Sequence, residues 1–437
     1  MTIHIERERS DRANWAGRAK RNFAVGFLVI CAATNHGMSI VPVASAQPRS
    51  ATATGWTMYQ GNPAHTGQSP FVGLTTFPLE LWRIHLEPLA SSGEKSAGMS
   101  LAANGTVYVS TSGRLFAVDP TSPSVKWTID MFDTSRSVPA VAPSGVLYWG
   151  VGDSFMSISP DGQPGFGWVN LDGNFVFGSS PVIDSDGNIY FSHDGVWSLK
   201  PNGDLRWMRP SGSFSHSSPA LSTDGTIYAA VYQAFLAIHP DGTLKWSLPV
   251  ETGDNDPVVA TDGTIYIGAV PEQMTGPARM LALNPDGTLR WSFLLDASTA
   301  SVGMPPGLGA DGTLYFGDGL QYAPEPDSAA FYAVSADGSL RWKRYFQGTG
   351  FFVKPPMIDR NDGITFCFRI SNCYGLSAEG DIRWQIRFPA DDLGLVGTDT
   401  VPLLIADGRM LILDSHDNLH LFTDAAAVVH LPSIIHP

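Results

Sequence analysis

The chain has 437 residues, of which 27 are basic and 41 acidic, and its net charge is −14. An acidic protein without a basic stripe repels phosphate backbones, so nucleic acid is excluded as an expected partner. The 45 glycines and 32 prolines are typical of a chain rich in turns and short strands.

The N-terminal segment has the features of an export signal. A basic stretch ends in Lys20-Arg21, an apolar run follows over residues 23–33, and Ala44-Ser45-Ala46 forms a small-x-small cleavage site. The apolar run is too short to span a bilayer. We therefore expect residues 1–46 to be a signal peptide and the mature chain to start at Gln47, in the periplasm or outside the cell. A retained membrane anchor is the alternative.

From residue 77 onward, one phrase of strands and turns is repeated. Each copy begins at a proline, continues with an Asp-Gly or Asn-Gly turn and a strand such as Asp224-Gly-Thr-Ile-Tyr228, and adds a strand centred on a small residue, as in Phe235-Leu-Ala-Ile238. A tight turn and a strand with tryptophan complete it. The tryptophans are Trp82, Trp127, Trp168, Trp207, Trp246, Trp291, Trp342 and Trp384, spaced 39 to 51 residues apart. This period predicts propeller blades, in which each tryptophan packs beside the small residue and seals one blade to the next.

Eight copies predict an all-β fold, an eight-bladed β-propeller of four-stranded antiparallel blades. It would cover residues 77–431, after a lead-in segment over residues 47–76 and before a tail over residues 432–437. We expect the two chain ends to share the last blade, with residues 79–82 in its outer strand and residues 401–422 in the three inner ones. Residues 427–431 are a competing outer strand, but the context of Trp82 matches the other copies better.

The phrase Asp-Gly-Thr-Leu-Arg-Trp on an eight-bladed plan resembles the pyrroloquinoline-quinone-like (PQQ-like) propeller repeat. Residues 56–70 (WTMYQGNPAHTGQSP) are similar to a lead-in segment that precedes such repeats in exported bacterial proteins. The resemblance implies the fold rather than one activity, because the superfamily includes quinone-dependent dehydrogenases, outer-membrane assembly scaffolds and sensor domains. In its alcohol-dehydrogenase branch, two adjacent cysteines lie against the cofactor, a Glu, an Asn and an Asp hold calcium, and a further Asp acts as the base. No positions of this sequence match these residues, so we expect no quinone cofactor.

The loops that lead from each outer strand to the next inner strand gather at one mouth of a propeller channel. On these loops we predict a ligand-binding set of Arg136, His216, Asp254, Asp256 and Lys354. A solvated rim with scattered charges is the alternative. The acidic residues of the 251–256 loop are explained by turn formation, so we predict no metal site. We predict no catalytic residues, because no Ser-His-Asp order or phosphate-binding glycine loop is present.

Cys367 and Cys373 flank a predicted hairpin turn, which allows a cross-strand disulfide in an oxidising compartment; two buried thiols are the alternative. Taken together, the sequence favours an exported, monomeric binding or scaffold propeller that presents its loop face to a protein, peptide or glycan. The rival hypothesis is an enzyme that acts at the channel mouth, either a quinone-dependent oxidoreductase or a propeller lyase or hydrolase.

Overall fold

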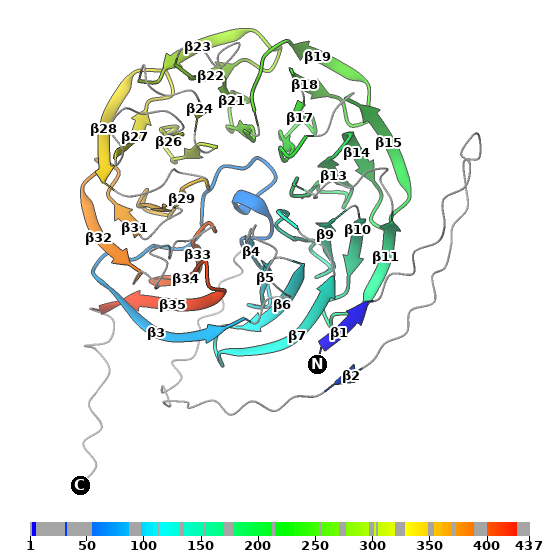
Figure 1. The fold of residues 1–437 in the computed structure, drawn as a ribbon. Coiled ribbons are helices and arrows are strands. Elements are labelled where there is room, and N and C mark those ends of the chain that lie inside the picture. The colour runs from blue at the N-terminus through cyan, green and yellow to red at the C-terminus, as the bar shows by residue number, and fades with distance from the viewer. Residues whose placement is uncertain are drawn as a thin grey trace.

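The computed structural model describes residues 2–5, 31–32, 55–86, 98–111, 113–131, 135–152, 154–169, 178–211, 215–231, 233–253, 255–270, 277–296, 301–302, 305–319, 328–347, 354–368, 372–388 and 400–425. Eight antiparallel sheets stand around a central channel (Figure 1), so the chain is an eight-bladed all-β propeller, as predicted. The described residues contain one helical element, the 3₁₀ turn η1 (Tyr59–Gly61). Within this part of the chain, no helix is long and apolar enough to cross a membrane.

Each blade runs from a short inner strand beside the channel to an outer strand on the rim. The first four blades are β4 (Gly98–Leu101), β5 (Val107–Thr111), β6 (Arg114–Asp119) and β7 (Ser124–Met131); β8 (Ala140–Val141), β9 (Leu147–Val151), β10 (Ser154–Ile158) and β11 (Pro164–Val169); β12 (Val182–Ile183), β13 (Ile189–Ser192), β14 (Gly195–Leu199) and β15 (Leu205–Pro210); and β16 (Ala220–Leu221), β17 (Ile227–Val231), β18 (Ala234–Ile238) and β19 (Leu244–Leu248).

The next three blades follow the same order. They are β20 (Val258–Val259), β21 (Ile265–Ala269), β22 (Arg279–Leu283) and β23 (Leu289–Leu294); β25 (Gly307–Leu308), β26 (Leu314–Gly319), β27 (Ser328–Val334) and β28 (Leu340–Gln347), with β24 (Ser301–Val302) also paired to β26; and β29 (Met357–Ile358), β30 (Ile364–Cys367), β31 (Asn372–Leu376) and β32 (Ile382–Arg387). At the rim of the first blade, β1 (Thr2–Ile5) pairs with β7 and with β2 (Cys31–Ala32).

The eighth blade joins the two ends of the chain. Its strands β33 (Leu403–Ala406), β34 (Arg409–Leu413) and β35 (Asn418–Asp424) are completed by β3 (Pro78–His85), which pairs with β35. The predicted closure through Trp82 is therefore confirmed, because Trp82 lies opposite Leu421 in this pair. The competing strand at residues 427–431, the tail at 432–437 and, apart from β1 and β2, the predicted signal peptide at 1–46 lie outside the described residues.

The tryptophans connect neighbouring blades, as the repeat predicts. Ala237 is the cross-strand partner of Trp246, so the small side chain leaves room for the indole within the blade. The indole then packs on Gly287 in the turn of the next blade and donates Nε1–H to the carbonyl oxygen of Pro285 (2.9 Å). The same bond to the next turn is made by Trp127, Trp207, Trp291 and Trp342.

The second blade departs from the expected pattern. Phe166 packs on Gly203 of the next turn, the place that a tryptophan takes in other blades, and its ring lies 6.0 Å from the ring of Tyr148. The register explains the difference, because Trp168 pairs with Phe155, two positions farther along β11. The prediction that Trp168 is equivalent to the other tryptophans is thus wrong.

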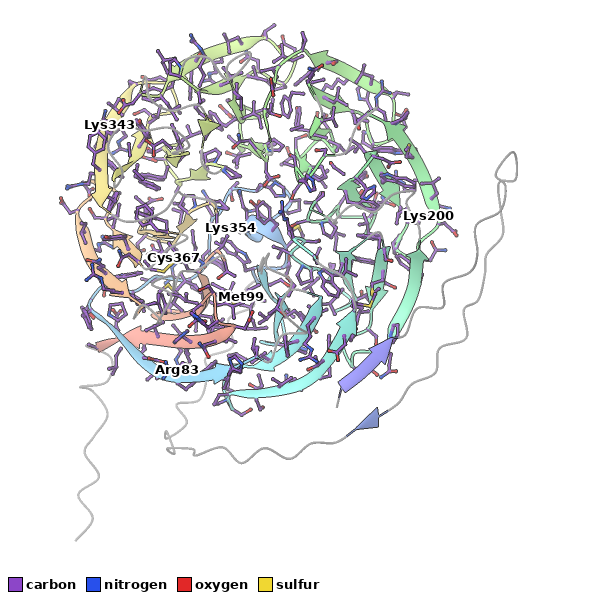
Figure 2. The ribbon with its side chains drawn as sticks, in the orientation of Figure 1. Arg83, Met99, Lys200, Lys343, Lys354 and Cys367 are labelled. Carbon is purple, nitrogen blue, oxygen red and sulfur yellow. A yellow bond between two sulfur atoms is a disulfide. The ribbon has the colours of Figure 1, made fainter. Side chains whose placement is uncertain are left out.

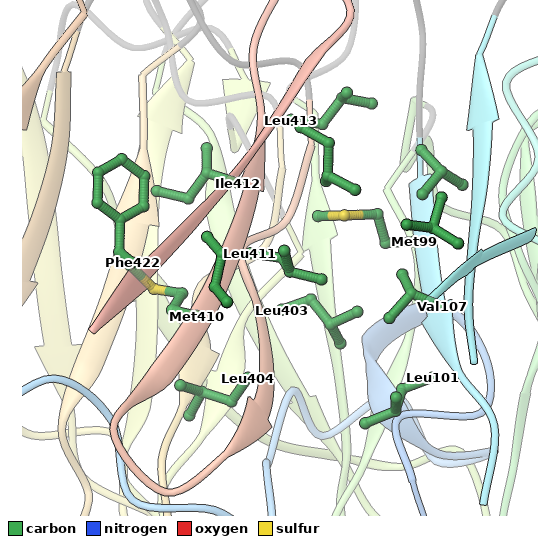
Figure 3. Close-up of a cluster of buried hydrophobic side chains, with 14 of the residues drawn as sticks. Met99, Leu101, Val107, Leu403, Leu404, Met410, Leu411, Ile412, Leu413 and Phe422 are labelled. Atoms are coloured by element: carbon green, nitrogen blue, oxygen red, sulfur yellow. The ribbon is translucent and has the colours of Figure 1, made fainter. Parts of the chain in front are cut away.

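Apolar side chains fill the space between neighbouring blades. At the closure, the side chains of β33–β35 face those of the first blade, with Leu403, Met410 and Leu411 opposite Met99 and Val107 (Figure 3). All of them are buried. Burying one such side chain stabilises the fold by about 1.5–3 kcal/mol, so the eighth blade is held to the first by packing as well as by strand pairing.

Candidate functional site in the central channel

The lead-in segment, residues 55–76, enters the channel that the inner strands surround. Its ribbon passes from the rim to the axis, where η1 lies (Figure 1). Trp56, Met58, Tyr59 and Gln60 are all buried there. The channel of this propeller is therefore filled in part by the chain's own N-terminal residues.

Backbone hydrogen bonds attach the lead-in segment to six inner strands in turn. At equivalent positions of β4, β8, β16, β20, β25 and β29, the N–H groups of Leu101, Val141, Leu221, Val259, Leu308 and Ile358 donate to carbonyl oxygens of Trp56, Thr57, Pro63, Ala64, Thr66 and Gly67, over 2.7–2.9 Å. These positions lie at the ends of the inner strands, away from the loops that carry the predicted site. The segment thus closes the channel on the side opposite the predicted binding mouth.

A belt of hydrogen bonds follows part of the channel wall and connects the residues that precede four of the inner-strand prolines. Val138 N–H donates to Ser180 Oγ, and Ser180 N–H donates to Ser218 Oγ, each over 2.9 Å. Ser218 N–H then donates to Asp256 Oδ1. Asp256 is buried, and its carboxylate also bonds to the hydroxyl of Tyr59 on η1. Burial raises the pKa of Tyr59 well above its usual value, and the Asp256 carboxylate raises it further, so this hydroxyl remains a donor.

His65 secures the lead-in segment beside the same blade. It is fully buried, its Nδ1 lies 3.2 Å from the carbonyl oxygen of Pro257, and its ring packs edge-on against Tyr59. Burial lowers the pKa of His65 to about 3, so the ring is neutral at physiological pH. Because Pro257 offers only an acceptor, Nδ1 carries the ring proton.

A small hollow remains on the loop side of η1. Its lining consists of Trp56, Tyr59, Gln60, Gly98, Met99, Val138, Lys354 and Val401. Figure 2 places Lys354 near the axis, beside η1. The walls are mostly apolar, and the polar groups come from the lead-in segment and from Lys354.

The structure separates the predicted ligand-binding residues. Asp256 and Lys354 both reach the channel, Asp256 in its wall and Lys354 at the hollow. Arg136 is exposed, and His216 is half-buried against Gly178 of the neighbouring loop. Asp254 lies outside the described residues. No convergence of all five is seen, so the set as a whole stays a prediction.

Comparison with protein families decides the classification. A family model described as outer membrane protein assembly factor BamB matches residues 79–274 and 145–347, which together span more than half of the chain. The chain belongs to this PQQ-like propeller family. A search of curated proteins finds no match to this PQQ-like propeller.

Solved structures share the fold of this PQQ-like propeller at low sequence identity. A quinohemoprotein alcohol dehydrogenase from Comamonas testosteroni aligns with a TM-score of 0.67 at 10% identity, over 86% of this chain and 81% of its own. A europium-containing methanol dehydrogenase aligns with a TM-score of 0.66 at 10% identity, over 85% and 98%. BamB from Moraxella catarrhalis aligns with a TM-score of 0.58 at 12% identity, over 79% and 99%. Enzymes and an assembly factor thus both resemble this propeller, and the likeness shows its fold alone.

The described residues of this PQQ-like propeller do not fit a quinone held as in the alcohol-dehydrogenase branch. Cys367 and Cys373 are not adjacent; they face each other across β30 and β31 and are joined by a disulfide. Both lie in the apolar cluster with Trp384, inside a blade rather than at the axis. Among the described residues, no three His, Cys, Asp or Glu side chains gather as metal ligands would.

Sequence reasoning missed the most important channel residues, which are Trp56, Tyr59 and Gln60. Their phrase stands out in the sequence only through its resemblance to the lead-in segment of other exported proteins. Nothing in its local pattern shows that it folds back into the channel, because the bonds that hold it join backbone groups up to hundreds of residues away.

Proposed function

We propose that this propeller is an exported binding or scaffold protein without chemistry of its own. It presents the mouth formed by its outer-to-inner loops to a protein, peptide or glycan. The observation that carries the proposal is the lead-in segment, which closes the opposite side of the channel with backbone bonds to six blades. A partner can then reach the axis through the loop mouth. The match to an assembly-factor family supports a macromolecular partner.

The channel chemistry supports binding over catalysis. Asp256, the carboxylate in the described channel wall, is bonded to Ser218 N–H and to Tyr59 hydroxyl. A carboxylate that is already engaged by two donors is poorly placed to act as a general acid or base for a ligand. The described channel therefore offers recognition groups rather than a proton-transfer pair.

Crosslinking in the native cell tests the proposal. A photoreactive residue at Arg136, which is exposed at the loop mouth, should give a defined crosslinked product. The matched control is a photoreactive residue at Leu340, which is exposed on the outer strand β28 and should give none. Products from Leu340 alone would place the binding surface on the rim and contradict the proposal. Dye-linked alcohol oxidation after loading with quinone and calcium would favour the enzyme instead.

Export is tested separately. The protein should be recovered from the periplasmic fraction or the medium, with an N-terminus at Gln47. Recovery of the intact Met1 chain in the membrane fraction would show that the segment is retained as an anchor.

A further inference from the structure

A carboxylate in the sixth blade stands where other blades carry mostly apolar side chains. Asp318 lies four residues after the start of β26 and is 4% exposed. The same place in the second strand of other blades is taken by Val151, Val231, Ala269 and Phe368, and by Thr111 and His193. Burial of an ionised carboxylate is strongly unfavourable unless the charge is paired. The surroundings of Asp318 therefore decide when it can carry a charge.

The short strand β24 lies against this carboxylate. It belongs to the connection between the outer strand β23 and the inner strand β25, and Figure 1 shows it beside β26. Val302 of β24 is the cross-strand partner of Asp318, so the two side chains are neighbours on one face of the sheet. Val302 is buried in the apolar cluster between the fifth and sixth blades. It packs so closely on Gly268 of the fifth blade that a Cβ atom there would lie 2.9 Å from it.

The charged and titratable groups around Asp318 come from three elements. Asp296, which follows β23, accepts hydrogen bonds from Lys343 Nζ (3.0 Å) and from the Tyr345 hydroxyl (2.8 Å), both on β28. Burial raises the pKa of Asp296, but the bonds to Lys343 and Tyr345 outweigh it and hold the pKa below its usual value. Tyr332 of β27 stays neutral, because burial and both carboxylates raise its pKa. β24 itself contains no titratable side chain.

Asp318 is thus the carboxyl of this group that changes charge near neutral pH. Burial raises the pKa of Asp318 to about 7; the N–H of Ala330 lowers it, the charge of Asp296 raises it, and Lys343 lowers it again. The Ala330 N–H donates to Asp318 Oδ1 over 2.9 Å and is its one donor among the described residues. A neutral carboxyl suits such a site. An ionised one is a buried charge with a single donor and a second carboxylate nearby.

We propose that β24 docks on β26 while Asp318 is neutral and detaches when Asp318 ionises. β24 is the neighbour that can move, because it forms two residue pairs with β26, whereas the seven-residue strand β27 is paired on both sides, with β26 and with β28. Detachment lets water reach the carboxylate. Since β24 lies on one of the outer-to-inner connections, pH would change one wall of the loop mouth. The effect of this change on a partner rests on the proposed binding function.

Docking of β24 should weaken as the pH rises. The pKa of Asp318 is about 7 in the docked state, whereas a hydrated aspartic acid has a pKa of about 4. Because the docked state holds the proton more tightly, docking is most favourable below pH 4 and weakens until the pH passes 7. Between pH 5.0 and pH 7.5, the equilibrium constant for detachment should rise by at least about 10-fold.

Hydrogen exchange of the full chain, followed by mass spectrometry, tests this. The measured quantity is the protection factor of peptides that contain Ser301 and Val302, because it removes the intrinsic pH dependence of exchange. We expect protection to fall at least 10-fold from pH 5.0 to pH 7.5. Peptides from the buried strand β9 of the second blade are the internal reference and should change much less. Equal protection of β24 at both pH values, or no protection at either, would overturn the inference.

Variants connect the effect to Asp318. Asp318→Asn keeps the shape of the side chain without its titration, so protection of β24 should no longer depend on pH. Asp318→Val, which installs the residue of two other blades, should do the same if the first variant folds poorly. Asp286→Asn is the matched control, because Asp286 is an exposed turn carboxylate of the fifth blade, and it should behave like the parent. A full pH response in either Asp318 variant would overturn the inference.

Asp296 provides a second test of the same cluster. Asp296→Asn removes the neighbouring negative charge, so β24 should detach at a lower pH than in the parent. Detachment at an unchanged or higher pH would contradict the electrostatic part of the inference.

The result can be separated from that of the proposed function. Exchange is measured on the protein alone, so it reports the docking of β24 whether or not a partner crosslinks at Arg136. Crosslinks at Arg136 together with pH-independent protection of β24 would refute the role of Asp318 and leave the binding function standing.

Discussion

His65, a buried side chain of the lead-in segment, makes the stability of the folded protein depend on pH. The folded protein keeps the ring neutral, because burial lowers the pKa of His65 to about 3, whereas the unfolded chain takes up a proton near pH 6.5. When the pKa of a histidine is lower in the folded than in the unfolded protein, the free energy of unfolding has its full value above the unfolded-state pKa. It falls as the pH drops from the unfolded-state pKa toward the folded-state pKa. Acidification should thus favour the unfolded chain through His65.

We predict that His65→Asn reduces this pH dependence. Asparagine tolerates the left-handed backbone of residue 65, with φ of 58°, and does not titrate. Between pH 7.5 and 5.5 the free energy of unfolding of the parent should fall by about 1 kcal/mol more than that of the variant, measured by urea denaturation. His239→Asn, at an exposed position, is the control and should behave like the parent. Parallel curves for parent and His65→Asn would show that His65 is not held neutral.

At the scale of strands and blades, the tryptophan contacts differ in their surroundings. Trp246 donates to Pro285 in an exposed bond. Trp384 is buried, and its indole N–H donates to the carbonyl oxygen of Leu74 over 2.9 Å. The tryptophan of the seventh blade thus bonds to the lead-in segment rather than to a turn of the next blade. Phe166 shows that a phenyl ring fits the same position in the second blade.

We predict that Trp384→Phe destabilises the protein by about 2–3 kcal/mol and that Trp246→Phe does so by about 1 kcal/mol. Both changes remove one hydrogen bond, but the first leaves a buried carbonyl oxygen of Leu74 unpaired and a void beside it. Chemical denaturation of the two variants in parallel measures the difference. Equal losses would mean that the bond to the lead-in segment contributes no more than a bond to a surface turn.

These elements also show what the sequence can and cannot predict. The blades follow from residue types at a fixed period, so the strand order and the closure through Trp82 were predictable. The place of Phe166 in β11 was missed, although Phe166 follows the turn glycine Gly162 by four residues, the same interval that separates Trp246 from Gly242. Asp256 and Lys354 were placed near the axis because each precedes an inner-strand proline. The burial of Gln60 in the channel depends on backbone bonds between distant segments, which no local pattern encodes.

For the whole molecule, two separate structural features hold the ring of blades together. The first is the shared eighth blade, where β3 pairs with β35 and His420 lies 3.1 Å from both Glu80 on β3 and Asp414. The contact between His420 and Glu80 thus ties the chain ends through side chains as well as through strand pairing. The second feature is the lead-in segment, which spans six blades at the channel.

The lead-in segment predicts how much of the N-terminus can be removed before the protein loses stability. Removal of residues 1–54 takes away β1 and β2 at the rim but leaves every described residue of the lead-in segment, so the melting temperature should change by less than about 3 °C. Removal of residues 1–76 keeps β3 and all eight blades yet deletes the buried Trp56 and the bonds to six inner strands. Loss of one buried tryptophan alone costs about 3–5 kcal/mol, so the melting temperature should fall by at least about 10 °C. If the two truncated proteins have the same melting temperature, the blades close without the lead-in segment, and that segment contributes to partner binding rather than to stability.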